Sequence, residues 1–318
     1  MKILIAGATG VLGRRIVRLS LERGHTVVGL ARSAASKAAV ESLGAVGVVA
    51  DIFDANAIAE AAGGADVVIH AATSIPVKAK TKPEDWELND RLRRDGTRVL
   101  TDTAQKLGAK TYIQQSIVWV ARPEDDSFFD ETTKVEKPGE LYRSALDGER
   151  IAAEAGAKYG YKVAVLRCGG FYSADARHTR MLAEALMKRH LPLIGGGMAV
   201  QANVHADDAA SAFVRAAEAG KQGLWHVTDD EPATLRDMLT EFARLLDAPK
   251  SRTFPLWLAR LFVGKGVIDF FTRSTRTLNT RFKQDLDWSP RFPSYREGLR
   301  QVVDEWNLNA SNGKERLS

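Results

Sequence analysis

The sequence predicts an α/β fold in which a doubly wound parallel sheet is covered by helices and accompanied by a smaller C-terminal substrate lobe. Three observations predict this fold. Short runs rich in Val and Ile alternate with helical stretches, a glycine-rich turn joins the first run to the first helix, and the alternation becomes irregular after Gly170. Alternating strands and helices are typical of a parallel sheet, because each strand must be followed by a crossover.

The expected strands are short and continuously apolar, which is typical of strands that are buried on both faces. They cover residues 2–7, 25–31, 46–50, 66–72, 110–116 and 162–170. The expected helices cover residues 11–24, 36–44, 55–64, about 85–107 and about 140–159. We therefore predict one domain over residues 1–170 with a returning segment near 200–228, and a substrate lobe formed by residues 171–199 and 229–318.

The composition favours a cytoplasmic protein without a membrane partner. The one cysteine, Cys168, rules out an internal disulfide, which fits a reducing compartment. The first apolar run, "ILIAG", is too short for a signal peptide. The apolar stretch of residues 254–271 contains Arg260, Lys265 and Asp269, so we expect amphipathic helices in the core or along a pocket instead of a membrane span.

Positive charge is concentrated near the C-terminus. The chain has a net charge of +5, whereas residues 250–300 contain eleven Lys or Arg and four Asp or Glu, which gives 11 − 4 = +7. No recognition-helix pattern or stacking motif accompanies this charge, so we expect a solvated basic face and no nucleic-acid partner. Binding of an anionic substrate group is the functional alternative. His178 and His205 lack partners at metal-ligand spacing, so we predict no metal site.

The glycine-rich turn is the strongest functional signal. "GATGVLG" places Gly7, Gly10 and Gly13 between the first expected strand and the first helix. In this context the glycines allow a tight turn, the approach of a pyrophosphate, and close packing of helix on strand. The helix N-terminus would then face the phosphates. This motif predicts a Rossmann-type dinucleotide-binding domain; a plain glycine turn is the alternative.

The end of the second expected strand indicates which dinucleotide is preferred. NAD sites usually have an acidic residue there, whereas "GLARS" supplies Arg32 and Ser33. A guanidinium can bind a 2′-phosphate through two hydrogen bonds. We therefore expect NADP(H) to be favoured over NAD(H), unless Arg32 is a solvated loop residue.

With these motifs the chain resembles the short-chain dehydrogenase/reductase superfamily, in its extended, NAD-dependent epimerase/dehydratase-like branch. "GATGVLG", "VVADIFD", "HAA" at residues 70–72, "VHADDAA" and "LDWSPRFPSYREGLR" carry this resemblance over nearly the whole length. The glycine turn and the resemblance together indicate these cofactor-binding residues: Gly7, Thr9, Gly10, Val11, Leu12, Gly13, Arg32, Ser33, Asp51, Ile52, His70, Ala71 and Ala72. Asp51 would contact the adenine, while Asp54 fits a helix N-cap.

The resemblance also implies a catalytic serine, tyrosine and lysine. Ser116 would polarise a substrate carbonyl, although its spacing to Trp119 is one residue short of the family pattern, and Tyr142 would exchange the proton. The lysine is absent, because Leu146 stands four residues after Tyr142. Asn89 corresponds approximately to a family asparagine; an exposed helix position is the alternative.

These features favour an enzyme, namely an NADP(H)-dependent oxidoreductase that reduces a carbonyl or related polar double bond of a fairly apolar small molecule. A nucleotide-sugar epimerase or dehydratase is an alternative, supported by the basic segment "TRSTRTLNTRFK". A non-catalytic NADP-binding sensor or scaffold protein is another. The sequence leaves a homodimer open.

Overall fold

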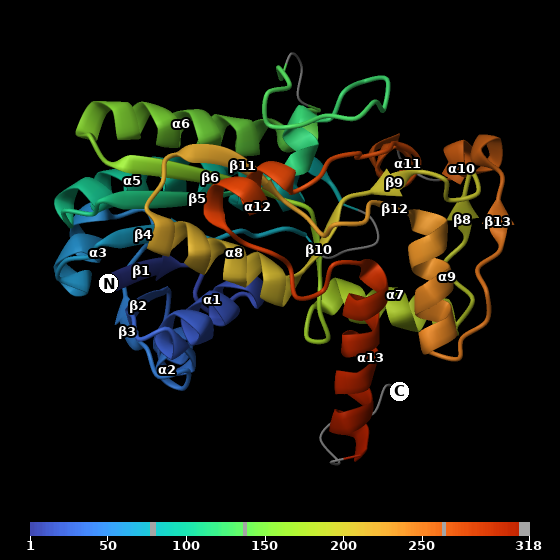
Figure 1. Ribbon diagram of the computed structural model, residues 1–318, viewed down its shortest axis with the longest axis horizontal. Helices are drawn as coiled ribbons and strands as arrows, with labels where there is room; N and C mark the ends of the chain where they lie inside the picture. The colour runs from blue at the N-terminus through green and yellow to red at the C-terminus, as the bar shows by residue number, and fades with distance from the viewer. Residues whose placement is uncertain (77–80, 136–138, 263–264, 312–318) are drawn as a thin grey trace.

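A seven-stranded parallel sheet forms the centre of the molecule (Figure 1). The computed structural model describes residues 1–76, 81–135, 139–262 and 265–311. The strand order is β11-β6-β5-β4-β1-β2-β3. The predicted fold class is therefore confirmed. The order reverses between β1 and β4, and ligands of such sheets bind beyond the carboxyl ends of the strands at this point.

The observed strands lie within the predicted ones, except that β5 extends one residue further, to Ile117, and that no strand prediction covered β11. They are β1 (Lys2–Ala6), β2 (Thr26–Ala31), β3 (Val46–Val49), β4 (Val67–His70), β5 (Thr111–Ile117), β6 (Lys162–Cys168) and β11 (Gly223–Val227). In register, Lys2 lies opposite Thr26, and Thr111 lies opposite Lys162. Aligned parallel strands bring the carboxyl ends of β1, β4 and β5 to one edge of the sheet.

Helices cover both faces of the sheet. One face carries α1 (Val11–Glu22), α2 (Ala34–Glu41) and α8 (Ala206–Ala219), and the other carries α3 (Ala55–Ala62), α5 (Thr97–Lys106) and α6 (Arg143–Tyr159). In Figure 1 the sheet runs obliquely from β11 to β3, with α5 and α6 on its upper-left side and α1 and α8 on its lower-right side. Each face has its own apolar core: Ile16 and Phe213 lie in the first, and Leu100 and Tyr112 in the second.

The predicted helix near residues 85–107 is interrupted. It consists of a 3-10 turn η1 (Pro83–Trp86), α4 (Glu87–Arg91), a π-helical turn η2 (Leu92–Gly96) and α5. The predicted helix near 140–159 begins with a 3-10 turn η4 (Glu140–Tyr142) and continues as α6. A π-helical turn frequently marks a functional site, because it widens the helix and changes the direction of its side chains.

Most of the remaining elements gather beside one end of the sheet, whereas residues 280–286 pack on the first core through Phe282 and Leu286 (Figure 1). The remaining elements are η3 (Val118–Ala121), β7 (Gly170–Tyr172), α7 (Arg177–Met187), β8 (Leu193–Ile194), β9 (Val200–Gln201), β10 (Asn203–His205), β12 (Ala233–Thr234), α9 (Leu235–Leu245), β13 (Thr253–Phe254), α10 (Leu256–Phe262), α11 (Lys265–Thr272), α12 (Thr280–Leu286) and α13 (Tyr295–Ser311). The buried residues of α7, α9 and α13 pack around a third apolar core. The domain boundaries given above stay a prediction.

The apolar stretch of residues 254–271 forms the short helices α10 and α11. Ala259 and Ile268 are buried, as expected, but Trp257 and Leu261 are 68% and 69% exposed. The expectation of a core or pocket lining is therefore met by only part of this stretch. Within the ranges that the structure describes, every helix is too short or too polar to cross a bilayer.

Candidate functional site

The glycine turn after β1 is held by close backbone contacts. Gly7 has φ +89°, and a Cβ on it would lie 2.7 Å from the backbone of Ala71 and Ala72. A Cβ on Gly13 would lie 2.0 Å from the carbonyl oxygen of Gly7. Both positions therefore require glycine, because the end of β4 and the start of α1 press against the turn from two sides.

The N-terminus of α1 is open to a ligand. Gly10 is the N-cap residue, and in the described part of the chain no side chain caps this end. A Cβ on Gly10 would approach only the Gly7 oxygen, at 3.3 Å. The first N–H groups of the helix, from Val11 and Leu12, thus remain available to an anion, and the helix dipole favours negative charge there. This geometry fits a dinucleotide pyrophosphate.

The residues at the ends of β2 and β3 lie on the surface. Arg32 is exposed, whereas the Ser33 hydroxyl is used as the N-cap of α2 and accepts from the Ser36 N–H at 3.3 Å. Asp51 is exposed, and its carboxylate accepts the Phe53 N–H at 3.0 Å. Asp54 caps α3, as the sequence suggested. Arg32 is consequently the only one of these residues whose side chain is both cationic and exposed beside β2.

His70 ends β4 inside the protein. Its Nδ1 lies 3.2 Å from both the Tyr112 hydroxyl and Thr97 Oγ1. Burial lowers the pKa of His70 to about 4, and the charge of Arg93 adds to this effect. Its Nε2 has no hydrogen-bond partner among the described residues. His70 is therefore neutral near pH 7, and it fixes the strand end against which the glycine turn packs.

The interrupted helix brings two buried polar residues toward this strand end. Asn89 is fully buried, and its Oδ1 accepts the Ser74 N–H at 3.1 Å, so it is not the exposed position considered above. Arg93 lies one turn further on and is 6% exposed. Burial lowers its pKa to about 10. Sequence reasoning missed Arg93; its spacing of four residues from Asn89 was the available signal.

Ser116 faces α6. Its Oγ donates to Glu149, whose carboxylate is bound by Arg167 through Nε at 2.9 Å and Nη2 at 2.7 Å. All three side chains are buried. Gln115 points to the other face of β5, since side chains alternate along a strand, and its buried Oε1 lacks a partner among the described residues. A catalytic role for Ser116 stays a prediction.

Tyr142 lies where η4 meets α6, beside two residues that follow β5. The Trp119 ring stacks at 6.5 Å between centroids, and the guanidinium carbon of Arg122 lies 5.8 Å from the Tyr142 ring centroid. Burial raises the pKa of the phenol above its usual value, Asp269 adds to this effect, and the charges of Arg122 and Arg273 offset it only in part. Arg122 was missed, because no local pattern links it to a tyrosine twenty residues later.

Leu146 occupies the position of the family lysine, one turn after Tyr142. It is half-buried in an apolar cluster with Tyr142 and Trp119, close to Val118 and Ala145. An ammonium in this place would have apolar side chains on its buried side and solvent on the other. Position 146 has thus been repacked as part of an apolar wall.

Metal and cysteine chemistry receive no support from the geometry. Among the described residues, no three His, Cys, Asp or Glu side chains are grouped as metal ligands. Cys168 is fully buried, and this burial raises the pKa of its thiol. A buried thiol that stays protonated is a poor nucleophile.

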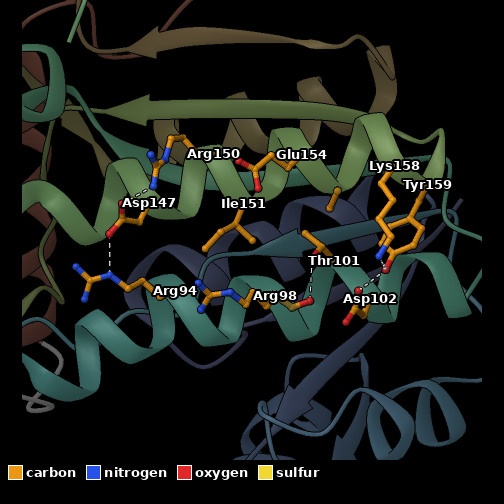
Figure 2. A pocket seen from close by; sticks show the side chains of 11 residues that line it. Arg94, Arg98, Thr101, Asp102, Asp147, Arg150, Ile151, Glu154, Lys158 and Tyr159 are labelled. Atoms are coloured by element: carbon orange, nitrogen blue, oxygen red, sulfur yellow. Dashed lines mark hydrogen bonds and ion pairs between the residues drawn. The ribbon is translucent and has the colours of Figure 1, made fainter. Parts of the chain in front are cut away.

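A groove of about 590 Å³ runs along the outer sides of α5 and α6. Figure 2 shows its charged walls, in which Arg94 pairs with Asp147 at 2.8 Å and the Tyr159 hydroxyl donates to Asp102 at 2.8 Å. None of the predicted site residues lines this groove. The homodimer left open by the sequence stays a prediction.

The parallel sheet, with its glycine turn at the reversal point, defines a Rossmann-type dinucleotide-binding protein. The chain belongs to the NAD-dependent epimerase/dehydratase family, whose sequence profile matches residues 3–227. The resemblance to the extended short-chain dehydrogenase/reductases is therefore confirmed. Members of this family use NAD or NADP as cofactor.

Similar proteins include reductases and sugar-nucleotide enzymes. A 3-diazoavenalumate denitrifying reductase of Streptomyces sp is 35% identical over 309 residues, which cover 94% of this chain and 99% of that protein. A quinoline-oxide ketoreductase of Stigmatella aurantiaca is 25% identical over 76% of this chain and 72% of its own. The crystal structure of UDP-glucose 4-epimerase from Thermotoga maritima has a TM-score of 0.80 at 20% identity, covering 98% and 100% of the two chains. The last likeness concerns the fold alone.

Proposed function

We propose that the protein is an NADP(H)-dependent reductase that acts on a carbonyl, or a related polar double bond, of a fairly apolar small molecule. The observation that carries the proposal is the apolar packing of Leu146 beside Tyr142. A free phenol has a pKa of about 10, so only about one in a thousand is ionised at pH 7. A neutral Tyr142 can donate a proton to a carbonyl oxygen but is a poor base, which favours reduction over oxidation.

The residues of the turn and the strand ends suit the proposed cofactor. Gly10, Val11 and Leu12 would hold the pyrophosphate, and Arg32 would bind the 2′-phosphate of NADP(H). When bound, the reduced nicotinamide supplies the hydride. The chain itself supplies the proton, from Tyr142, and an apolar wall that includes Trp119 and Leu146.

The relatives support a reductase. A relative that is 35% identical over 94% of this chain and the ketoreductase are both reductases by name. A nucleotide-sugar epimerase or dehydratase is less well supported, because such a cycle needs a base as well as an acid. Two of the cations considered for a diphosphate are also engaged: Lys283 with Asp230 at 2.8 Å, and Arg281 with Asp285 at 3.4 Å.

A second candidate function is the reductive removal of dinitrogen from an aromatic diazo compound. The specific observation in its favour is the whole-length relative that carries this chemistry in its name. An arenediazonium ion that accepts hydride becomes an arene and dinitrogen, and no proton is transferred. A site with a weakened acid–base group would suit such a reaction.

Tyr142→Phe distinguishes these functions. Reduction of an aromatic ketone or aldehyde by NADPH should fall at least about a hundredfold, the usual contribution of a positioned acid, while NADPH affinity stays the same. The rate is measured by NADPH absorbance with panels of carbonyl compounds and arenediazonium salts. Full carbonyl activity in the variant would remove Tyr142 from the chemistry. Diazonium reduction unaffected by the substitution would support the second candidate, and an absence of turnover with both panels would support the non-catalytic alternative.

Arg32→Asp should reverse the cofactor preference. Loss of a charged hydrogen-bond donor costs about 1.5–3 kcal/mol, so NADPH affinity should fall about ten- to a hundredfold, while NADH affinity should rise because aspartate can accept from the ribose hydroxyls. Fluorescence titration with both cofactors measures this change. Arg18→Asp, an equal charge change at an exposed position of α1, is the control. Equal affinities for the two cofactors in the parent would contradict the assignment of Arg32.

A further inference from the structure

We propose that Arg122 supplies, from the loop after β5, the positive charge beside Tyr142 that a lysine at position 146 would supply. Arg122 is a positioning residue in this proposal, because it acts on the reaction through Tyr142. The consequences for turnover rest on the proposed carbonyl reduction. The electrostatic effect on Tyr142 can be measured without any substrate.

The geometry of the aromatic pair carries the proposal. The backbone turns sharply in η3 after β5, so that Trp119 and Arg122 both reach Tyr142. The guanidinium carbon lies 5.8 Å from the ring centroid, within the range of a cation–π contact. Tyr142 is thereby held between an indole ring, a guanidinium and the apolar cluster that contains Leu146.

In the described part of the chain, no carboxylate is bonded to the guanidinium of Arg122. Its Nη1 is buried and has no hydrogen-bond partner among the described residues, and it forms no ion pair within this part of the chain. A partly buried cation without a bound counter-ion acts strongly on a neighbouring phenolate, because little water screens the two charges.

The other charged groups around Tyr142 do not replace Arg122. Arg273, which follows α11, pairs with Asp126 at 3.2 Å and donates to the Pro123 carbonyl oxygen. Asp269 of α11 opposes the arginines, since its charge raises the pKa of Tyr142. Asp126 and Asp269 also act on Arg122 through their charges, but among the described residues Asp126 is bonded to Arg273 and no carboxylate forms an ion pair with Arg122.

The two arginines closest to Tyr142 along the helix point elsewhere. Arg143 is exposed. Arg150 pairs with Asp147 at 3.2 Å on the outer side of α6 (Figure 2). Proximity in sequence would have favoured these residues, whereas the fold brings a cation from a different loop.

The proton balance shows why a cation helps. When a carbonyl is reduced, the O–H bond of Tyr142 breaks, the proton passes to the carbonyl oxygen, and a phenolate remains until solvent reprotonates it. The reduced nicotinamide of the proposed function supplies the hydride. An adjacent cation stabilises the phenolate as it forms. Burial still raises the pKa of Tyr142 above its usual value, so the phenol stays protonated between turnovers and remains a poor base. Arginine retains its charge across the accessible pH range, so this support would not titrate.

The direct experiment measures the ionisation of position 142. A fluorinated tyrosine, which ionises at lower pH than tyrosine, is introduced there, and its ¹⁹F shift is followed against pH in the full chain. Arg122→Gln should raise the apparent pKa by about one unit or more, and Arg122→Lys should restore most of the shift. Arg143→Gln, an exposed neighbour, should change nothing. Equal values for the parent, Arg122→Gln and Arg122→Lys would overturn the proposal.

A relocated charge provides the complementary test. Adding Leu146→Lys to Arg122→Gln should bring the fluorotyrosine pKa back toward that of the parent, because the cation returns one helical turn from Tyr142. Arg122→Met retains the aliphatic stem and serves as the neutral variant if glutamine lowers the melting temperature. Carbonyl reduction should fall at least about tenfold in the neutral variants, with its pH profile displaced in parallel with the titration. A titration that shifts as expected in a protein that reduces no carbonyl would reject the proposed function and leave the role of Arg122 intact.

Discussion

Arg167→Met should destabilise the protein by about 3–5 kcal/mol, because it leaves Glu149 as an uncompensated charge in the interior. The two side chains are only 4% and 6% exposed and are joined by two hydrogen bonds. The remaining hydrogen bond from Ser116 cannot replace a guanidinium. Urea unfolding followed by circular dichroism would measure the loss.

Two further variants test whether the loss of stability comes from the buried ion pair or from the removal of any arginine. Arg94→Met breaks the more exposed ion pair with Asp147 and should cost less than about 1 kcal/mol. Arg167→Met combined with Glu149→Leu should recover much of the stability, because an apolar pair of similar volume avoids both desolvation costs. If Arg167→Met alone stays within about 1 kcal/mol of the parent, Glu149 is protonated or hydrated, and the ion pair is not the basis of its burial.

Replacing either of two glycines in the turn by alanine should have different effects on melting temperature and NADPH affinity. Gly10→Ala should leave the melting temperature nearly unchanged, since φ is −73° and its Cβ meets only one oxygen at 3.3 Å. It should still lower NADPH affinity at least about tenfold, because the methyl group occupies the approach of the pyrophosphate. Gly13→Ala should lower both quantities, as its Cβ would lie 2.0 Å from the Gly7 oxygen and force α1 away from the turn at a cost of about 1–3 kcal/mol.

Melting curves and fluorescence titrations of the two variants test this contrast. Gly24→Ala, far from the turn, should lower the melting temperature through its positive φ and leave NADPH affinity unchanged, so it controls for the effect of lost stability alone on cofactor binding. Unaltered NADPH affinity in Gly10→Ala would mean that the pyrophosphate does not cross the first turn of α1.

Local patterns predicted the sheet and the glycine turn, because their information lies within a few neighbouring residues. Gly7, Gly10 and Gly13 are constrained by contacts inside a single strand–turn–helix unit. The prediction failed for contacts that depend on how distant segments meet. Arg122 reaches Tyr142 only after β5 has turned into η3, and no spacing rule connects the two.

The direction of a side chain was the second kind of information that the sequence lacked. Ser116 was identified from a motif, but the pleat of β5 directs its hydroxyl toward Glu149. The missing lysine was visible in the sequence, whereas the apolar cluster around Leu146 depends on residues from several loops. The π-helical turn that buries Arg93 had no recognisable pattern either.

The position of β11 affects how the protein is made. This strand forms an edge of the central sheet beside β6, and α8, which precedes it, packs on α1. During synthesis, the strands up to Cys168 leave the ribosome while α1 still lacks its partner helix and β6 still lacks its outer neighbour. The nascent chain must therefore shield an apolar face and an open strand edge until Val227 has been added. The segment from α8 to β11 is thus also the segment whose synthesis covers this apolar face and closes this strand edge.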